Sequence, residues 1–411
     1  MPDTMIQPAA PPTQTPLPTA APTAPARPAN SECPAPANPS LPQLPASAQM
    51  ASALLGYLNA GATLEQAGAA LAAWGASTLE PGTNLAIGGV TSARLLPKED
   101  AQVIAVFSLA QGNGVATRAG DVLVAACDKG QYRTIYLASQ DAAFGAPVPN
   151  PRLHSVLDVT GDGIADASFT SGECGSGTCI NGLTVLAHLP AQDTFGLANI
   201  SQDIVGAPNA TFSFASNGAG QVLTIAHGTF NDVNAGPQRG SSETWAFNGV
   251  VMGQTGASRE PALYRIHVLH DADDAFRKKD FAGATALYNR VISDAGLQAW
   301  DGPGALKEEL SALGAFAQFR LAQLALAQGN VAGANAAFAS LASMPANPES
   351  QPYAAMAKAV NDALTDMKDL IVACNTAVAF AEKSPQTYEQ LGSATFGFSN
   401  PDYLPADMCI Q

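Results

Sequence analysis

The sequence predicts a multidomain protein of β and α structure, in which an antiparallel all-β domain is followed by a short stack of helices. Two observations carry this prediction. Residues 79–256 contain short runs of β-branched and aromatic residues separated by Gly, Asn and Asp, whereas the chain after Glu260 has a helical spacing of apolar side chains. The length of 411 residues allows two or three domains.

The first 47 residues are a tract of Pro, Ala and Thr that includes 14 of the 30 prolines. Such a tract cannot form a core, so we expect residues 1–47 to be a disordered, extended linker. The displayed start has neither the basic nor the apolar region of a secretion signal. Because Pro/Thr stalks often follow a signal or lipid anchor in bacterial surface proteins, we expect such a signal ahead of it.

A small helical element is expected over 48–78, where Thr63 and Gln66 fit a capping box ahead of an Ala-rich helix. The all-β domain is expected over 79–256. This length suits one sandwich or a partial propeller-like core, and the spacing of the strands favours antiparallel pairing. The expected strands include 102–107, 121–125, 132–137, 183–187, 210–214, 222–225 and 243–247.

The stretch 158–166 has the residue pattern of a calcium loop. Carboxylates stand at its first, fifth and ninth positions, a hydroxyl at its third and a glycine at its sixth. Ca²⁺ takes six to eight oxygen ligands, and alternate side chains on a tight loop can converge on one ion together with a backbone carbonyl. The expected ligands of a structural Ca²⁺ are Asp158, Thr160, Asp162, Ile164 (through its carbonyl) and Asp166.

The surroundings of this loop distinguish it from an EF-hand. An EF-hand requires a bidentate Glu at position 12, where this chain has Phe169, and it requires flanking helices, whereas 154–157 and 167–170 look like strands. The loop is therefore expected to close a β-hairpin. The alternative is an Asp- and Gly-rich turn that binds no ion, since these residues suit hairpins by themselves.

The segment 157–166 resembles the calcium loop of VCBS/FG-GAP repeats, the integrin-like propeller blades. In that family the loop joins two strands of a blade and its Asp side chains hold Ca²⁺. The resemblance implies a blade-like fold with Asp158, Thr160, Asp162 and Asp166 as side-chain ligands, although Thr160 stands where the family usually has Asp or Asn. A second stretch, 231–236, has part of the pattern but lacks the closing acids.

A helical domain is expected over 257–384, followed by a C-terminal tail, 385–411. Two segments of it share a turn, then a small residue, then an aromatic residue four positions later. They resemble the second helix of a tetratricopeptide repeat, which implies a short α-solenoid that binds a protein or a peptide. The matching segments are 279–288, with Ala284 and Tyr288, and 329–338, with Ala334 and Phe338; 320–327 fits a first helix, and helices near 353–368 and 369–383 would extend the array.

The six cysteines permit three disulfides. Closeness in sequence favours Cys174–Cys179. Cys374–Cys409 would then tie the tail to a helix, and Cys33–Cys127 would tie the linker to the β domain; the alternative is reduced, buried cysteine. Oxidation agrees with a calcium loop, because calcium is abundant mainly outside cells, and the two together predict an extracellular or cell-surface protein.

The charge balance disfavours some partners. The net charge is −15 and no basic run is longer than Arg277–Lys278–Lys279, so nucleic acid and anionic membranes are poor partners. No segment is expected to cross a membrane. Motifs of catalysis are missing: Gly-x-Ser-x-Gly does not occur, Ser176 has no assignable His–Asp partners, and there is no phosphate loop or dinucleotide fingerprint.

A few other side chains have a functional and a structural interpretation. His267 and His270 lie one helical turn apart, ahead of three acids, so a transition-metal site is an alternative to an ordinary polar helix face. The remaining histidines are expected to be structural. The tryptophans could line a carbohydrate-binding face, but each alone is more often a core residue, and an acid near the calcium loop could add a ligand. These residues are Asp271, Asp273 and Asp274; His154, His188 and His227; Trp74, Trp245 and Trp300; and Glu173.

The sequence therefore favours a non-enzymatic secreted or cell-surface scaffold, with a structural calcium site and a helical-repeat surface for a protein partner. The rivals are a secreted carbohydrate-active or hydrolytic protein and a glycan-binding module. A hydrolase would need two carboxylates that converge in a pocket. A glycan-binding module would need an exposed aromatic row on one sheet face, and a peptide-binding protein would need a concave, partly apolar groove on 257–384.

Overall fold

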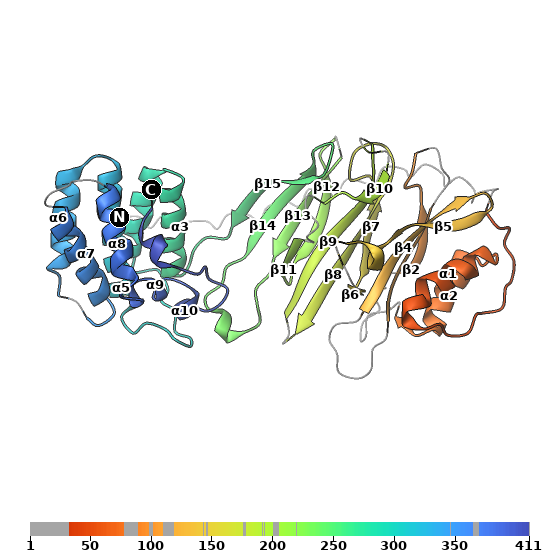
Figure 1. Cartoon of the computed structure of the whole chain (residues 1–411), viewed down its shortest axis with the longest axis horizontal. Helices are drawn as coiled ribbons and strands as arrows, with labels where there is room; N and C mark the ends of the chain where they lie inside the picture. Colours follow the sequence, from red (N-terminus) through yellow and green to blue (C-terminus); the bar gives the residue numbers. More distant parts are fainter. Residues whose placement is uncertain are drawn as a thin grey trace, which may run out of the picture.

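The computed structural model shows an elongated molecule built from successive layers (Figure 1). Two helices cover one face of a first β-sheet, two further sheets follow, and a helical domain lies at the far end. The expected combination of antiparallel sheets and helices is confirmed, and the sheets of the described residues do not close into a barrel. The structure describes residues 33–77, 89–97, 102–109, 119–142, 144, 147–175, 178–190, 192, 194–199, 205–218, 220–345, 347–364 and 370–410.

The three sheets, together called the β stack, are antiparallel and are built mainly from hairpins of successive strands. The first sheet has the order β1-β3-β4-β5, with β2 also on β3 and β6 on β4. The second has the order β10-β9-β8-β7 with β11 also on β9, and the third has the order β12-β13-β14-β15. The strands are β1 (Ala76–Ser77), β2 (Gly89–Ala93), β3 (Gln102–Leu109), β4 (Ala119–Asp128), β5 (Gln131–Leu137), β6 (Val148–Pro149), β7 (Arg152–Leu157), β8 (Asp166–Gly175), β9 (Thr178–Leu189), β10 (Thr194–Leu197), β11 (Val205–Pro208), β12 (Thr211–Ser216), β13 (Gln221–His227), β14 (Ser241–Phe247) and β15 (Met252–Arg259).

Strand β3 explains why the sheets stack. Its residues 103–107 are all apolar and all buried, which is the pattern of a strand covered on both faces. Alternate side chains point to opposite faces of a strand. The odd-numbered ones pack against α1 (Met50–Asn59) and α2 (Leu64–Ala73), whereas Ile104 and Val106 belong to a core shared with the second sheet.

The second and third sheets form a further core, in which Val185 and Ala187 pack with Leu223 and Ile225. The opposite face of the third sheet has small and polar side chains, which lets the stack end without a fourth sheet, as the outer faces of terminal repeats do. By the strand register, the residues of that outer face include Thr211, Ser213, Thr224, Ser242 and Thr244.

The Pro-rich chain runs along α1 and α2 from Cys33 onward, where the description begins. Two aromatic side chains hold it there. The Tyr57 hydroxyl donates to the carbonyl of Pro39 at 3.3 Å, and the Trp74 indole N–H donates to that of Pro42 at 3.2 Å. The earlier part of the expected linker lies outside the described residues.

The helical domain consists of successive helices, each packed on the next, and two of these helices begin alike. The Asp280 side chain accepts from the N–H of Gly283 at 2.9 Å, and that of Asn330 accepts from Gly333 at 3.0 Å. A Cβ on either glycine would lie within 2.5 Å of the capping side chain, which would have to shift to make room. The helices are α3 (Arg265–Arg277), α4 (Phe281–Ser293), α5 (Glu309–Ala327), α6 (Val331–Ala342), α7 (Gln351–Ala363), α8 (Leu370–Ala381), α9 (Gln386–Glu389) and α10 (Ser393–Phe396), followed by the 3-10 turn η4 (Pro405–Met408).

The repeated small and aromatic residues occupy equivalent places in one core: Ala284, Tyr288, Ala334 and Phe338 are fully buried. In each of the two helices, the alanine and the aromatic residue one turn later face this core. Among the described helices, α5 alone is long and apolar enough to cross a membrane, and most of it is buried inside this core.

The C-terminal segment covers one side of the helical domain. Leu391, Phe396, Tyr403, Met408 and Ile410 are buried in the helical core. The backbone of the segment is bonded to the helices as well, since the side-chain amide of Gln323 on α5 donates to the carbonyl of Met408 at 2.8 Å. The chain's own tail therefore lies against α3, α5 and α8.

Three disulfides are present, with the pairings that the sequence favours. Cys33–Cys127 joins the Pro-rich chain to β4, and Cys174–Cys179 closes the turn between β8 and β9. Cys374–Cys409 joins α8 to the end of the tail. Because the first and third pairs link segments far apart in sequence, they fix the two ends of the described chain to the layers beside them.

Candidate functional site

The proposed calcium loop joins β7 to β8, so it closes a β-hairpin rather than linking two helices. Its turn is made by the backbone. Gly161 and Gly163 have φ of 79° and 82°, values that other residues rarely adopt. The Asp158 carboxylate accepts from both of these N–H groups, at 2.6 and 2.9 Å, and the Asp162 carboxylate accepts from Ile164 at 2.8 Å.

Two buried oxygen atoms of the loop, one on its third residue and one on its last, have no hydrogen-bond partner. One oxygen of the Asp166 carboxylate accepts from the N–H groups of Val159 and Thr160, at 2.8 and 2.9 Å. Its other oxygen, and the Thr160 hydroxyl, are buried without a hydrogen bond. Burial raises the pKa of Asp166 to about 7, although the two N–H bonds and the nearby Thr160 hydroxyl oppose the shift. A carboxylate and a hydroxyl oxygen of this kind fit the ligand preference of Ca²⁺.

The acidic side chains of the loop do not converge on one point where an ion could bind. No group of three or more His, Cys, Asp or Glu within the described residues is close enough to hold a metal ion. Asp158 and Asp162 instead bond to the backbone of their own turn, which is what a turn without an ion would do. The loop therefore supplies the right kind of oxygen atoms at both ends, without a preformed cage.

The histidines and acids of α3 do not form a metal site either. The Nε2–H groups of His267 and His270 donate to the carbonyls of Pro237 and Leu391, at 3.1 and 2.9 Å. Burial lowers the pKa of both imidazoles, that of His267 to about 4, so both are neutral at pH 7. The acid directly after His270, Asp271, bonds to Arg239. These residues attach α3 to its neighbours.

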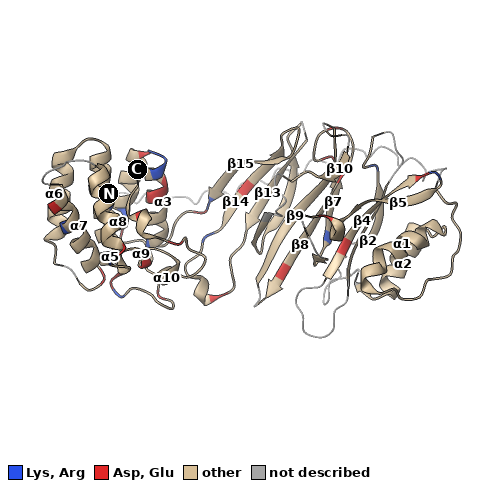
Figure 2. Cartoon of the chain, viewed as in Figure 1, with Lys and Arg blue, Asp and Glu red and all other residues tan. Residues whose placement is uncertain are grey.

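An ion-pair network joins the β stack to α3. Charged residues are sparse along the whole chain (Figure 2), so a continuous set of them is distinctive. Arg239 makes a bidentate contact with Asp271, while Arg259 lies 3.5 Å from Asp271 and 3.1 Å from Asp274. Arg277 of the same helix lies 3.1 Å from Asp274. The network fixes the third sheet on the exposed side of α3.

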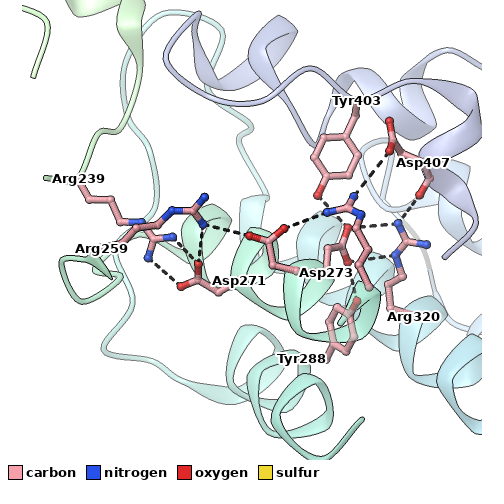
Figure 3. Close-up of polar contacts among 10 residues, drawn as sticks. Arg239, Arg259, Asp271, Asp273, Tyr288, Arg320, Tyr403 and Asp407 are labelled. Atoms are coloured by element: carbon pink, nitrogen blue, oxygen red, sulfur yellow. Dashed lines mark hydrogen bonds and ion pairs between the residues drawn. The ribbon is translucent and has the colours of Figure 1, made fainter. Parts of the chain in front are cut away.

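The network continues into the helical core (Figure 3). Arg277 approaches Asp407 of the tail at 3.7 Å, and Arg320 of α5 donates to the carbonyl of Asp407. Arg320 also pairs with Asp273 at 3.2 Å. Asp273 accepts from the hydroxyl of Tyr403 at 2.8 Å, and burial raises the pKa of this tyrosine well above its usual value, so it remains a donor. One polar chain thus runs from the third sheet to the centre of the helical domain.

A cleft of about 620 Å³ lies beside this network, between the third sheet and the helical domain. Its most exposed apolar wall is the ring of Phe398, which is 52% exposed and meets Phe230 edge to face at 5.0 Å. The opposite wall is basic, but its guanidinium groups are already paired with carboxylates. The residues of this interdomain cleft include His227, Phe230, Pro237, Arg239, Arg259, His267, Asp274, Arg277, Phe398 and Tyr403.

The other candidate residues have structural surroundings. His154 packs on the rings of Phe212 and Phe214, His188 is buried, and His227 lies 3.6 Å from Glu243. Trp74 and Trp245 contribute to cores of the β stack and Trp300 packs on the helical core, so they form no common face. Glu173 is exposed on β8, and Ser176 lies outside the described residues. In the partial second loop, 231–236, Asp232 accepts from the N–H of Asn234 at 2.8 Å.

No family model, curated protein or solved structure matches the chain. The likenesses to calcium-loop blades and to tetratricopeptide helices therefore depend on the loop and helix residues themselves.

Proposed function

We propose that the protein is a non-enzymatic secreted or cell-surface scaffold. In this proposal Ca²⁺ stabilises the β stack at the loop 158–166, and the helical domain offers a surface to a protein or peptide partner. The observation that carries it is the pair of unpartnered buried oxygen atoms of Thr160 and Asp166 inside a loop of calcium type. The three disulfides support an extracellular location, because disulfides persist mainly in oxidising compartments.

The chemistry of the loop supports a cation at this place. The residues that would hold Ca²⁺ are Asp158, Thr160, Asp162, Asp166 and the carbonyl of Ile164. A buried carboxylate with a raised pKa costs free energy when it ionises, and a divalent cation offsets that cost by supplying the missing opposite charge. The ion would add no reaction chemistry there; it would hold the turn and neutralise the acids.

The likenesses also support a scaffold of stacked units. The three sheets follow one another as meanders of the kind found in VCBS/FG-GAP blades, and the matching caps at Asp280 and Asn330 agree with tetratricopeptide-type hairpins. Such arrays present long surfaces to partners. Because the tail covers one side of the helices, we place the partner at the interdomain cleft and at the exposed helix faces.

A chelation experiment tests the calcium site. Asp162→Ala removes a proposed ligand, and Asp232→Ala is a matched control, because both carboxylates are exposed and each accepts from the N–H two residues later at 2.8 Å. At a hundredfold excess over Kd, Ca²⁺ should stabilise the wild type and Asp232→Ala by about 2.7 kcal/mol and Asp162→Ala much less. The measurement is thermal unfolding with calcium and with EDTA. Equal melting of the wild type in both buffers would refute the calcium site.

The aromatic pair of the interdomain cleft favours the rival glycan-binding function. An exposed ring beside polar groups suits the stacking of a sugar, and Phe398 has that exposure. Titration with defined oligosaccharides should then give binding that Phe398→Ala abolishes and Leu404→Ala, an exposed tail residue outside the cleft, leaves intact. A hydrolytic function lacks this support, because both cleft carboxylates are engaged: Asp274 is paired with arginines, and Asp402 accepts from the Ser393 hydroxyl.

A further inference from the structure

The loop 158–166 is bonded to all three sheets of the β stack. It belongs to the second sheet through β7 and β8. The N–H of Ala165 donates to the carbonyl of Arg94 at 3.1 Å, directly after β2 of the first sheet. The N–H of Gln221, the first residue of β13 in the third sheet, donates to the carbonyl of Val159 at 3.1 Å. Two backbone bonds at opposite ends of one short loop therefore reach the layers on either side.

The side chains of the loop repeat this arrangement. Val159 is 1% exposed and lies in the core between the second and third sheets. Ala165 packs against the core between the first and second sheets. A shift of either end of the loop would therefore disturb the packing of a neighbouring sheet as well as its hydrogen bond.

The turn between β12 and β13 is in close contact with the loop backbone. Gly220 has a φ of 154°, and a Cβ placed there would lie 2.8 Å from the carbonyl oxygen of Val159 and 3.3 Å from the carbonyl carbon of Thr160. Thr160 is a proposed ligand, so the third sheet touches the loop at the place where the ion would be held. Gly218 lies in the same turn with a φ of 86°, but a Cβ there would have nothing within 4 Å.

We propose that the loop is a calcium-dependent clamp that fixes the three sheets of the β stack relative to one another. This inference rests on the proposed calcium site. An ion bound by Asp158 at one end of the loop and Asp166 at the other makes the two ends a single rigid unit. Val159, which contacts the third sheet, and Ala165, which contacts the first, then cannot move independently. Without the ion, the acids of the loop repel one another, and only the hydrogen bonds from Val159 and Thr160 to Asp166 link its two ends.

Hydrogen exchange of the full chain, measured with calcium and with EDTA, tests the clamp. If a sheet can open locally only after the loop has lost its ion, the free energy of calcium binding adds to the free energy of that opening. At a hundredfold excess over Kd, calcium should slow exchange of the Gln221 and Ala165 amides by up to about a hundredfold. Central amides of β9, which are bonded within the second sheet, should change much less.

Two glycine variants separate the clamp from simple ion binding. Gly220→Ala keeps every proposed ligand but pushes the third sheet off the loop, whereas Gly218→Ala also places a Cβ on a residue of positive φ, without that contact. We expect Gly220→Ala to bind Ca²⁺ in calorimetry while losing the calcium-dependent protection of Gln221, and Gly218→Ala to retain both. Wild-type binding of Ca²⁺ with unchanged exchange at Gln221 and Ala165 would overturn the clamp and leave the calcium site standing. Absence of calcium binding in the wild type would overturn both.

Discussion

Asp273 and Arg320 form an ion pair, 3.2 Å apart, in which both side chains are completely shielded from water. Tyr288 and Tyr403 donate to the same carboxylate, at 2.5 and 2.8 Å. These residues come from α3, α5, α4 and the tail, so the carboxylate is the point at which four segments meet. The pair is satisfied because every lone pair facing the core has a donor, which is the condition for a buried ion pair to be tolerated.

Removing the charge of Asp273 should therefore destabilise the protein strongly. Asp273→Asn leaves the Arg320 guanidinium buried without its counter-charge, which should lower the free energy of unfolding by about 3–5 kcal/mol. Asp362→Asn breaks an exposed pair with Lys358 and should cost less than about 0.5 kcal/mol. Urea unfolding measures both. Similar losses in the two variants would contradict a special role for the buried pair.

Glu309 should make stability depend on pH. Burial raises its pKa to about 7 from 4.5, although the N–H of Trp300 donates to it at 2.7 Å and opposes the shift. The folded state thus binds more protons than the unfolded state between these values. The free energy of unfolding should fall as the pH rises from about 4.5 to about 7, by on the order of 2 kcal/mol.

Glu309→Gln provides the control for this dependence, because it keeps a side-chain oxygen for the Trp300 N–H and does not titrate. The difference in stability between variant and wild type should grow in favour of the variant across this pH window. EDTA in every buffer keeps calcium from adding its own pH dependence. A difference that is constant with pH would contradict the raised pKa.

Calcium binding should weaken in acid. The Asp166 pKa of about 7 means that a proton competes with the ion for this carboxylate. Below pH 7 the Kd for Ca²⁺ should therefore rise by about tenfold per pH unit, and above pH 7 it should level off. Titration calorimetry at pH 6, 7 and 8 measures the trend. A Kd that is the same at all three values would show that Asp166 is not a ligand.

The junction between the β stack and the tail should depend on one glycine. Gly236 has a φ of 83°, and a Cβ there would lie 1.5 Å from the carbonyl oxygen of Phe396. Gly236→Ala should separate this loop from the tail and cost about 3 kcal/mol or more. Gly249→Ala has the same kind of backbone strain, at a φ of 96° with nothing within 4 Å, and should cost about 1–2 kcal/mol.

Limited proteolysis tests whether the contact between this loop and the tail is intact. The loop between β13 and β14 should become cleavable in Gly236→Ala and stay protected in Gly249→Ala, because the first variant opens the contact and the second does not. Equal cleavage of both variants would mean that the loop does not depend on its contact with the tail.

Local patterns predicted local structure well. The capping box of Thr63 and Gln66 is present, and the shared turns before α4 and α6 have matching caps. The apolar run 103–107 indicates a buried strand as well as a strand, because a strand without polar alternation is covered on both faces. That run could have predicted a stack in place of one sandwich.

The sequence did not predict which residues would pair over long distances along the chain. Arg239 and Asp271 are 32 residues apart, and Arg320 and Asp273 are 47 apart, with nothing local to mark either pair. The closeness of the α3 acids in sequence suggests a metal site. In the structure their side chains diverge to the third sheet and to α5, since consecutive helix positions face different directions.

The Cys33–Cys127 bond determines how the protein would respond to mechanical force. Tension applied to the chain ahead of Cys33 passes through the bond directly into β4, in the middle of the first sheet. Everything between the two cysteines, including α1, α2, β2 and β3, lies in a covalent loop that bears no load. A pull from that side would therefore strain the stack itself while its helical cover stays folded, and reduction of this one bond would transfer the load to α1.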